Sequence, residues 1–277
     1  MANTKISAGT DPGPLLGTDR LPLARSPSTT AFAATVAEIA SYASTVAATP
    51  SFNYADNSGF SVNQRTYISG AALAAGIYGF DRWKAGAGGC TLTFTASPPS
   101  TTVTITAGTL QQVVEGASVQ GGNYMLSWVG TAQGRVGAGA YAVSPVAVTG
   151  ATAGANLTIE FNAGTLSQVK FGSGTVATAW QAKAARDELS NCQRFFMTGN
   201  TYGFAYGVAG NPVHSLHSLP VTMRGVPAVN VLGTPTYSNS SGLSLTPVDQ
   251  SVFITSFTVT ATATCQVGFS YTASADP

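Results

Sequence analysis

NQRTYISGAALAAGIYGFDRW, residues 63–83, concentrates charge and aromatic rings in a chain that otherwise contains little charge. Only 8% of the 277 residues are Asp, Glu, Lys or Arg. Arg65, Asp81 and Arg82 nevertheless all fall in this stretch, together with the indole of Trp83 and further aromatic rings. Charged groups beside rings in so neutral a chain indicate either a cluster that locks the fold or a platform for a ligand.

The end of this stretch, YGFDRW, is predicted to lie on a strand. Because side chains two residues apart on a strand share a face, Asp81 and Trp83 would lie on one face, and Phe80 and Arg82 on the other. An arginine fork and a carboxylate beside rings close a β-sandwich through charge-assisted hydrogen bonds and cation–π stacking. We therefore interpret Arg65, Asp81, Arg82 and Trp83 as a structural signature. The alternative is a sugar platform built on Trp83.

The bulk composition restricts the class of protein. Charged residues are far below the roughly 25% typical of soluble domains, so Ser, Thr, Asn, Gln and backbone groups must supply the polar surface. The formal net charge of +1 gives no field that would steer nucleic acid or an anionic membrane to the chain. We expect no nucleic-acid partner and no membrane insertion. A surface this neutral suits a subunit that is covered by its neighbours.

The cysteines indicate no metal site, and we expect no other cofactor. Cys90, Cys192 and Cys265 form no zinc motif, and we predict that they are buried free thiols. The N-terminus bears on a separate question, which is secretion. The N-terminus lacks the apolar core of a secretion signal. The alanine-rich stretch 32–48 is interrupted by Glu38 and is predicted not to span a membrane. We expect a protein made and assembled in a cytoplasm.

The first 50 residues are predicted to be an attachment segment. Residues 1–31 are rich in Pro and Gly and should be extended. TVAEIASYA, residues 35–43, begins with the capping-box pair Thr35 and Glu38 and repeats its apolar residues at helical spacing, which predicts a short helix. The alternative is a flexible tail.

Residues 51–180 have the pattern of half-buried antiparallel strands. Apolar and polar residues alternate, or an apolar run stands between turn signals, in CTLTFTA (90–96), TTVTITA (101–107), LQQVVEG (110–116), NYMLSWVG (123–130) and NLTIEFNAG (156–164). Short strands at regular spacing, separated by Gly- and Pro-containing turns, predict a β-sandwich or a jelly roll.

Residues 181–277 are predicted to be a second, β-rich unit. ARDELSNCQRFF (185–196) should be a helical turn that leads into a strand, with Asp187 and Glu188 on its polar face. The stretch 251–275 alternates as two strands. Long neutral strands with open edges aggregate in a free monomer. We therefore expect packing between subunits to cover them.

Several of these stretches, taken in order, resemble a known family. QR (64–65), YGFDRW (78–83), LQQVVEG (110–116) and YMLSWVG (124–130) are similar to a jelly-roll module common in bacteriophage tail fibres and related virion proteins. That module looks like the carbohydrate-binding β-sandwiches of polysaccharide-degrading enzymes. GTVATAWQAKAARDELSNCQRFF (174–196) and LPVTMRGVPAV (219–229) resemble the segments that follow the module, and GTDRLPLAR (17–25) with TVAEIASYA resembles a virion-attachment leader.

The resemblance implies a structural virion protein, made in the host bacterial cytoplasm and located in the virion. We expect a tail fibre or receptor-binding protein that attaches to other virion proteins through its N-terminal arm and contacts bacterial surface glycans. The trimers of fibre-like proteins further imply a homotrimer, in which packing around a threefold axis covers the neutral strand edges. Two alternatives stay open. One is a structural decoration of the head, collar or baseplate without a receptor role, and the other is a polysaccharide depolymerase.

A fibre attached by its N-terminal arm meets its host with its C-terminal unit. TYGFAYGVAG (201–210) is predicted to be a strand with Tyr202, Phe204 and Tyr206 on one face. The candidate glycan-binding residues of this unit are Tyr202, Tyr206, Asn211, His214 and His217. Tyrosine gives a large contact area at small entropic cost. The alternative for the two tyrosines is packing between subunits.

Metal binding and catalysis are weaker hypotheses. Residues three apart on a strand face opposite ways, so His214 and His217 of one subunit would not share a metal, although a threefold axis would gather three copies of one histidine. A depolymerase needs two carboxylates a few ångströms apart. The candidates are Asp56, Asp81, Glu115 and Glu160, of which Asp81 and Glu115 occupy structural positions of the resemblance. No sequence motif of a serine hydrolase, zinc protease or phosphate-binding loop supports catalysis, and we expect none.

Overall fold

The chain forms two compact units, residues 1–51 and 52–277. The computed structural model describes residues 20–23 and 32–35 of the first unit and the whole of the second. In the first unit, β1 (Arg20–Leu23) and β2 (Phe32–Thr35) pair antiparallel. The helix predicted over 35–43 lies outside the described residues, except for Thr35, which ends β2.

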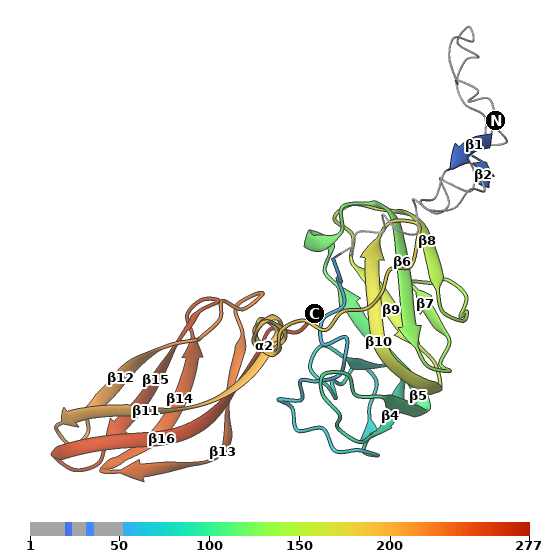
Figure 1. The fold of residues 1–277 in the computed structure, drawn as a ribbon. Helices are drawn as coiled ribbons and strands as arrows, with labels where there is room; N and C mark the ends of the chain where they lie inside the picture. Colours follow the sequence, from blue (N-terminus) through green and yellow to red (C-terminus); the bar gives the residue numbers. More distant parts are fainter. Residues whose placement is uncertain (1–19, 24–31, 36–51) are drawn as a thin grey trace, which may run out of the picture. The chain divides into compact units, whose positions relative to one another are not determined.

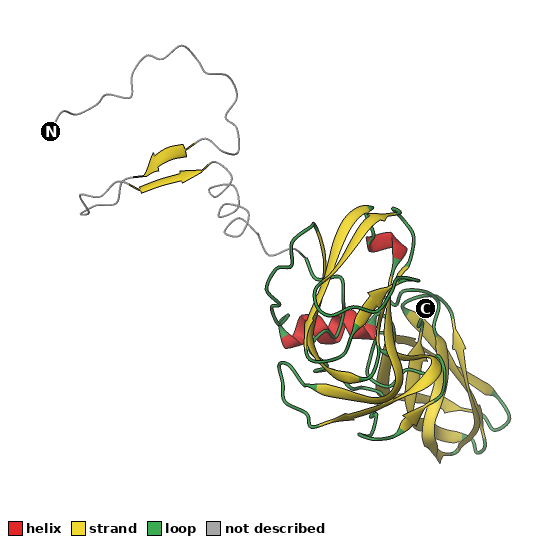
Figure 2. Cartoon of the chain, turned by 90° about the vertical axis from the view of Figure 1, so that its right-hand side faces the viewer, coloured by secondary structure: helices red, strands yellow, loops and turns green. Residues whose placement is uncertain are grey.

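Antiparallel β-structure dominates the described chain, with 52% of residues in strands, and the prediction of a mainly β protein is confirmed (Figure 1, Figure 2). The first part of the second unit is one sheet of eight strands. Its strands are β3 (Ala72–Leu73), β4 (Lys84–Phe94), β5 (Val103–Val114), β6 (Gly122–Val129), β7 (Gly134–Val136), β8 (Val146–Ala151), β9 (Leu157–Phe161) and β10 (Gly164–Ser173). A single turn of 3-10 helix, η1 (Gly116–Ser118), follows β5.

The eight-stranded sheet folds over to enclose a core. β10 pairs with β5 at its start, then shifts register and pairs with β6. β5 pairs with β9 along its second half. The ring of Trp128 on β6 and the ring of Phe161 on β9 have centroids 5.0 Å apart, so the apolar sides of these strands meet. This arrangement is consistent with the predicted β-sandwich.

The prediction of separate strands at 101–107 and 110–116 is wrong, because both belong to the continuous strand β5. The residues between them do not turn the chain back. Gly108 has a φ of +70°, and a Cβ at this position would lie 2.0 Å from the carbonyl oxygen of Gly89. Only glycine permits this close approach of β4 and β5, where the register of the pair shifts.

The end of the opening stretch is a turn ahead of β4, so the predicted strand alternation of Phe80, Asp81, Arg82 and Trp83 is wrong. The amide of Trp83 donates to the carbonyl of Phe80 at 3.0 Å, and Arg82 takes a left-handed φ of 71°. This conformation directs Trp83 into the core, where it is 0% exposed. Its indole nitrogen donates to Asn57 O at 3.0 Å, and its ring stacks on Phe60. Trp83 therefore offers no surface to a ligand.

The second part of the unit begins with α2 (Ala185–Gln193), which leads into β11 (Phe196–Gly207) as predicted. Two three-stranded sheets follow (Figure 1). One has the order β11–β16–β13 and the other β12–β15–β14. The remaining bounds are β12 (Pro212–Ser218), β13 (Ala228–Ser238), β14 (Ser240–Pro247), β15 (Val252–Val259) and β16 (Ala263–Ser274). The two strands predicted over 251–275 are thus confirmed.

The inner and outer faces of β11 differ in the size of their side chains. A Cβ on Gly203 would lie 2.6 Å from the ring of Phe257, and a Cβ on Gly207 would lie 2.6 Å from Val259. The large side chains of β15 therefore occupy the space above the glycines of β11. Tyr202, Phe204 and Tyr206 alternate with these glycines and share one face, as predicted, and that face is the outer one.

The three cysteines are free and buried, and the prediction for them is confirmed. Cys90 belongs to the first hydrophobic core and Cys265 to the second, while Cys192 lies on α2. Burial raises the pKa of Cys90 to about 12, and that of Cys192 further. Neither thiol is a nucleophile at neutral pH, since the thiolate is the reactive form.

The opening stretch joins the two cores through its arginines. The guanidinium carbon of Arg82 lies 3.4 Å from the ring centroid of Phe195, and that of Arg65 lies 3.8 Å from the ring centroid of Phe196. Arg82 also contacts Asp56 Oδ2 at 3.2 Å and donates to Val113 O at 2.8 Å. Two successive phenylalanines at the entry to the second sandwich are thus each covered by an arginine.

Ion pairs surround the two stacks. Arg65 Nη2 lies 2.5 Å from Asp276 Oδ2, near the end of the second sandwich. Glu115 accepts hydrogen bonds from Arg194 at 2.7 Å and from Arg224 at 2.5 Å. Glu115 follows β5, whereas both of its partners follow α2, so these pairs tie the two parts of the unit together.

Replacing Trp83 with alanine should lower the free energy of unfolding by about 3–5 kcal/mol, because it removes a fully buried indole and leaves a cavity. Chemical denaturation of the parent and the variant measures this difference. Phe52→Ala is the matched control, since Phe52 is 65% exposed and its loss should cost far less. Equal losses in the two variants would contradict the structural role of Trp83.

Deletion of residues 1–48 should leave the melting temperature of the remaining chain unchanged, because residues 52–277 form a compact unit of their own. Differential scanning calorimetry of the full chain and the truncated chain tests this. A truncated chain that is insoluble, or that melts several degrees lower, would show that the first unit is needed for folding.

Candidate functional site

The outer face of β11 presents three exposed aromatic rings in a row. Tyr202 is 70% exposed, Phe204 is 66% exposed and Tyr206 is 73% exposed. Successive rings stand two residues apart on one strand, so they repeat at about 7 Å, given a rise of about 3.4 Å per residue. We call Tyr202, Phe204 and Tyr206 the aromatic row.

The strand beside the row leaves room for its first ring. Tyr202 pairs with Gly268 on β16, and Gly268 pairs on its other side with Thr236 on β13. A Cβ on Gly268 would lie 2.9 Å from both the Tyr202 ring and Thr236 Oγ1. The ring therefore lies across the glycine, and beside it is a shallow hollow of about 260 Å³ lined by Asn200, Thr234, Thr236 and Ser270.

The sheet that carries the row is neutral. Its three strands contain no Asp, Glu, Lys or Arg residue. Phe204 pairs with Gln266 and Tyr206 pairs with Thr264, so the polar neighbours of the rings are an amide and hydroxyl groups. Such a face offers flat apolar surfaces together with uncharged donors and acceptors. It is suited to a ligand with apolar faces and many hydroxyl groups, or to another neutral protein surface.

The structure does not bring the two predicted histidines to this face. His214 is exposed on the outer side of the opposite sheet, where Nδ1 lies 2.7 Å from Ser256 Oγ. His217 points between the sheets and stacks on Phe253 with ring centroids 5.1 Å apart. Its nitrogens lie 2.9 Å from Thr201 Oγ1 and 3.0 Å from Thr255 Oγ1.

Burial lowers the pKa of His217, which favours the neutral ring. Asn211 lies in the exposed turn between β11 and β12, where its amide donates to Val208 O at 3.0 Å. Of the five predicted residues, only Tyr202 and Tyr206 therefore share one surface. The remaining three fall on the turn, the interior and the opposite face of the second sandwich.

The candidate carboxylates for catalysis are held by cations or amides. Asp56 contacts Arg82 and Lys183, Glu115 contacts two arginines, and Glu160 lies 2.6 Å from Arg135 Nη2. Asp56 and Glu115 line a small cavity of about 140 Å³ together with arginines. Among the described residues, no group of His, Cys, Asp and Glu is arranged to hold a metal ion.

Of the four candidate carboxylates, Asp81 alone forms no ion pair with another described residue. It accepts hydrogen bonds from the Gln64 amide at 2.6 Å and from Gln64 Nε2 at 3.1 Å. Gln64 Nε2 also donates to Phe196 O at 3.0 Å. Burial raises the pKa of Asp81 to about 6, even though the bonds from Gln64 and the charge of Arg65 act in the opposite direction.

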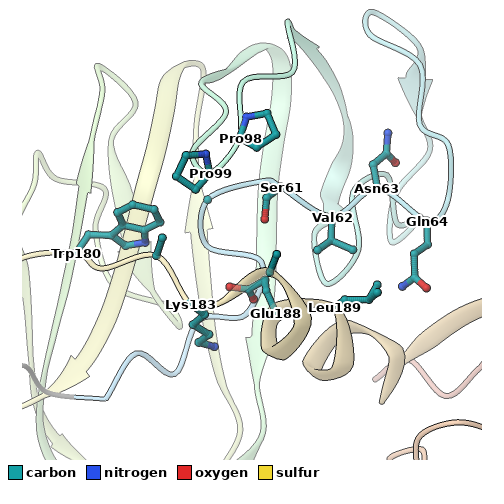
Figure 3. Close-up of a pocket in the computed structure, with 13 residues that line it drawn as sticks. Ser61, Val62, Asn63, Gln64, Pro98, Pro99, Trp180, Lys183, Glu188 and Leu189 are labelled. Carbon is teal, nitrogen blue, oxygen red and sulfur yellow. The ribbon is translucent and has the colours of Figure 1, made fainter.

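The sequence did not indicate a cavity that lies beside α2. It measures about 520 Å³ and lies between the loop 59–64, the pair Pro98–Pro99 and the segment 180–189 (Figure 3). The prediction that Glu188 lies on a polar helical face is wrong: its side chain is directed inward, and the residue is only 5% exposed. Burial raises the pKa of Glu188. Trp180, on the opposite wall, stands in a stretch without regular structure, where no periodicity marks it.

Comparisons with protein families, with curated proteins and with solved structures found no match. In the part of the chain that the structure describes, no helix is long and apolar enough to cross a membrane.

The raised pKa of Asp81 predicts a specific pH dependence of stability. The folded protein binds this proton more tightly than the unfolded chain, whose carboxyl has a pKa near 3.8. Asp81 therefore contributes stability below about pH 4, and this contribution is lost as the pH rises to about 6. The Asp81→Asn variant has no ionisable group at this position, so its stability should not fall in this way as the pH rises. The stability of the parent relative to the variant should fall across this interval by up to about 3 kcal/mol.

Urea denaturation at several pH values between 4 and 7 measures this difference. Asp187→Asn is the control, because the Asp187 side chain is 60% exposed and should show no such trend. A stability difference between the parent and Asp81→Asn that does not change with pH would disprove the assignment.

Proposed function

We propose that this chain is a structural protein of a bacteriophage virion, a fibre-like receptor-binding protein that contacts bacterial surface glycans. The phage assignment rests on the ordered motifs between residues 64 and 229 that resemble fibre modules. The glycan assignment rests on the aromatic row. Attachment to other virion proteins through residues 1–50 and assembly into a homotrimer belong to the same proposal.

The aromatic row suits a neutral polysaccharide for chemical reasons. The ring of a sugar has faces of C–H groups that pack on aromatic rings, and its edges carry hydroxyl groups that need uncharged partners. Rings that repeat at about 7 Å along a flat strand can be stacked by successive units of an extended chain. Gln266 and Thr264, which pair with Phe204 and Tyr206, supply an amide and a hydroxyl beside the rings.

A structural role without a receptor is the competing function. The exposed rings would also suit packing against another copy of the chain, since apolar patches of this kind commonly mark protein interfaces. The two functions differ in what covers the row. A subunit interface covers the row permanently, whereas a receptor-binding surface has to stay free in the assembled protein.

The double variant Tyr202→Ala and Tyr206→Ala should bind bacterial glycans at least tenfold more weakly than the parent, a loss of about 1.4 kcal/mol or more. Binding is first measured on an array of bacterial surface polysaccharides and then by titration with the best ligand. His214→Ala is the control, because His214 is exposed on the opposite sheet and its loss should leave binding unchanged.

Light scattering on the same variants separates the two functions. An unchanged mass with weaker glycan binding supports the receptor role. A changed mass would place the aromatic row in a subunit interface, and the glycan proposal would then fail. Release of oligosaccharides from the polysaccharide by the parent would instead identify a depolymerase.

A further inference from the structure

The cavity beside α2 has the size and the lining of a binding site, and no residue of the aromatic row lines it. Its volume of about 520 Å³ falls within the range of small-molecule sites. Trp180 and Pro99 stand on one side, and Glu188 and Leu189 of α2 stand on the other (Figure 3).

The tryptophan wall is held in a fixed position. Trp180 Nε1 donates to Ser58 Oγ at 3.0 Å, and Ser58 is only 1% exposed. The ring also packs on Gly59, where a Cβ would lie 3.1 Å from Trp180 Cζ2 and 2.5 Å from Pro99 O. Because Trp180 is half-buried and lines the cavity, part of its ring stays accessible from the cavity. A rigid ring of this kind favours stacking, since little side-chain entropy is lost on binding.

The opposite wall contains a buried carboxyl with free acceptor capacity. Glu188 is 5% exposed, and its Oε1 accepts a hydrogen bond from the backbone amide of Asn57. Among the described residues no donor reaches Oε2, and Glu188 forms no ion pair. Oε2 is not among the described buried side-chain atoms that lack a partner, so it stays accessible. A ligand in the cavity that supplies an N–H or O–H group can therefore donate to Oε2.

The start of α2 adds hydrogen-bond donors, which complement the acceptor of Glu188. Ala184 caps the helix without a side-chain hydrogen bond, and Ala185, the first helical residue, lines the cavity. The first amides of a helix have no partner within the helix and favour an acceptor such as a carbonyl oxygen. Ala185 and Glu188 are three residues apart, which is a distance of about 4.5 Å along the helix axis. A ligand group that carries both an acceptor and a donor can therefore contact both ends of this first turn.

The lining carries one charged group of each sign, Lys183 and Glu188. Lys183 Nζ lies 3.1 Å from Asp56 Oδ1, so its charge is already paired. The rest of the lining is largely apolar, with Val62, Pro98 and Leu189.

We propose that this cavity binds an N-acetylated sugar residue. The acetamido N–H donates to Glu188 Oε2, the acetamido carbonyl accepts from the first turn of α2, and the methyl group packs on the apolar lining. The sugar ring lies against Trp180. This inference goes beyond the proposed function, because it assigns a second site with its own chemistry on a different part of the chain.

Titration of the full chain with N-acetylglucosamine, glucose and glucosamine, followed by calorimetry and ligand-observed NMR, tests the proposal. N-acetylglucosamine should bind, glucose should bind at least tenfold more weakly because it lacks the amide, and glucosamine should also bind more weakly because it lacks the carbonyl and the methyl group. Equal binding of glucose, or tighter binding of glucosamine, would overturn the assignment. So would an absence of binding by N-acetylglucosamine.

Glu188→Gln should weaken the binding of N-acetylglucosamine at least tenfold. Its amide oxygen can still accept from Asn57, whereas its NH₂ group cannot accept from the ligand. Asp187→Asn is the matched control, because it removes the same charge from the exposed side of α2. Leu189→Trp is a second variant at a position that is 38% exposed, and it should fill the cavity and abolish binding without disturbing the core. Unchanged binding in both Glu188→Gln and Leu189→Trp would overturn the site.

Discussion

A guanidinium group that is almost fully buried must find partners for its charge and for both of its flat faces. The Arg82 side chain is 1% exposed, and Asp56, Val113 O and the ring of Phe195 supply most of these partners. Breaking a buried ion pair by removing one partner typically costs about 3–5 kcal/mol. Arg82 also takes a left-handed backbone conformation, which is unfavourable by about 1–2 kcal/mol for a residue with a side chain. The contacts around the guanidinium must offset this cost, so the turn at residues 80–83 forms only together with its surroundings.

The same requirement fixes the elements beside the turn. Phe195 lies between α2 and β11, so the stack with Arg82 anchors the junction of the two elements. The loop before Arg65 forms one wall of the cavity, and Glu188 on α2 forms another. The amide of Asn57 donates to Glu188, and Asn57 O accepts from Trp83. The buried arginine, the buried tryptophan and the cavity are therefore parts of one hydrogen-bonded assembly.

The sequence predicts those features that depend on local periodicity. Strand alternation located β4, β5, β6, β9, β11, β15 and β16 and the shared face of three rings on β11, because a half-buried strand has to alternate. It misplaced the turn at Asp81 and Arg82, since nothing in a single sequence shows that an arginine will take a positive φ. It also placed Glu188 on a polar face, because the partner that buries this residue, Asn57, is 131 positions away in the chain. The cavity was not predictable for the same reason: its walls come from three distant segments.

The residues on the inner face of β11 are needed for core packing, whereas the large residues on its outer face are not. The inner positions hold Gly203 and Gly207, where Phe257 and Val259 supply the bulk, so the core gains its volume from β15. The outer positions hold Tyr202, Phe204 and Tyr206, and nothing in the core depends on these rings being large. Small polar residues would satisfy the same backbone and avoid exposing apolar surface to water. Three large rings kept at such positions are therefore best explained by contact with something outside the folded chain.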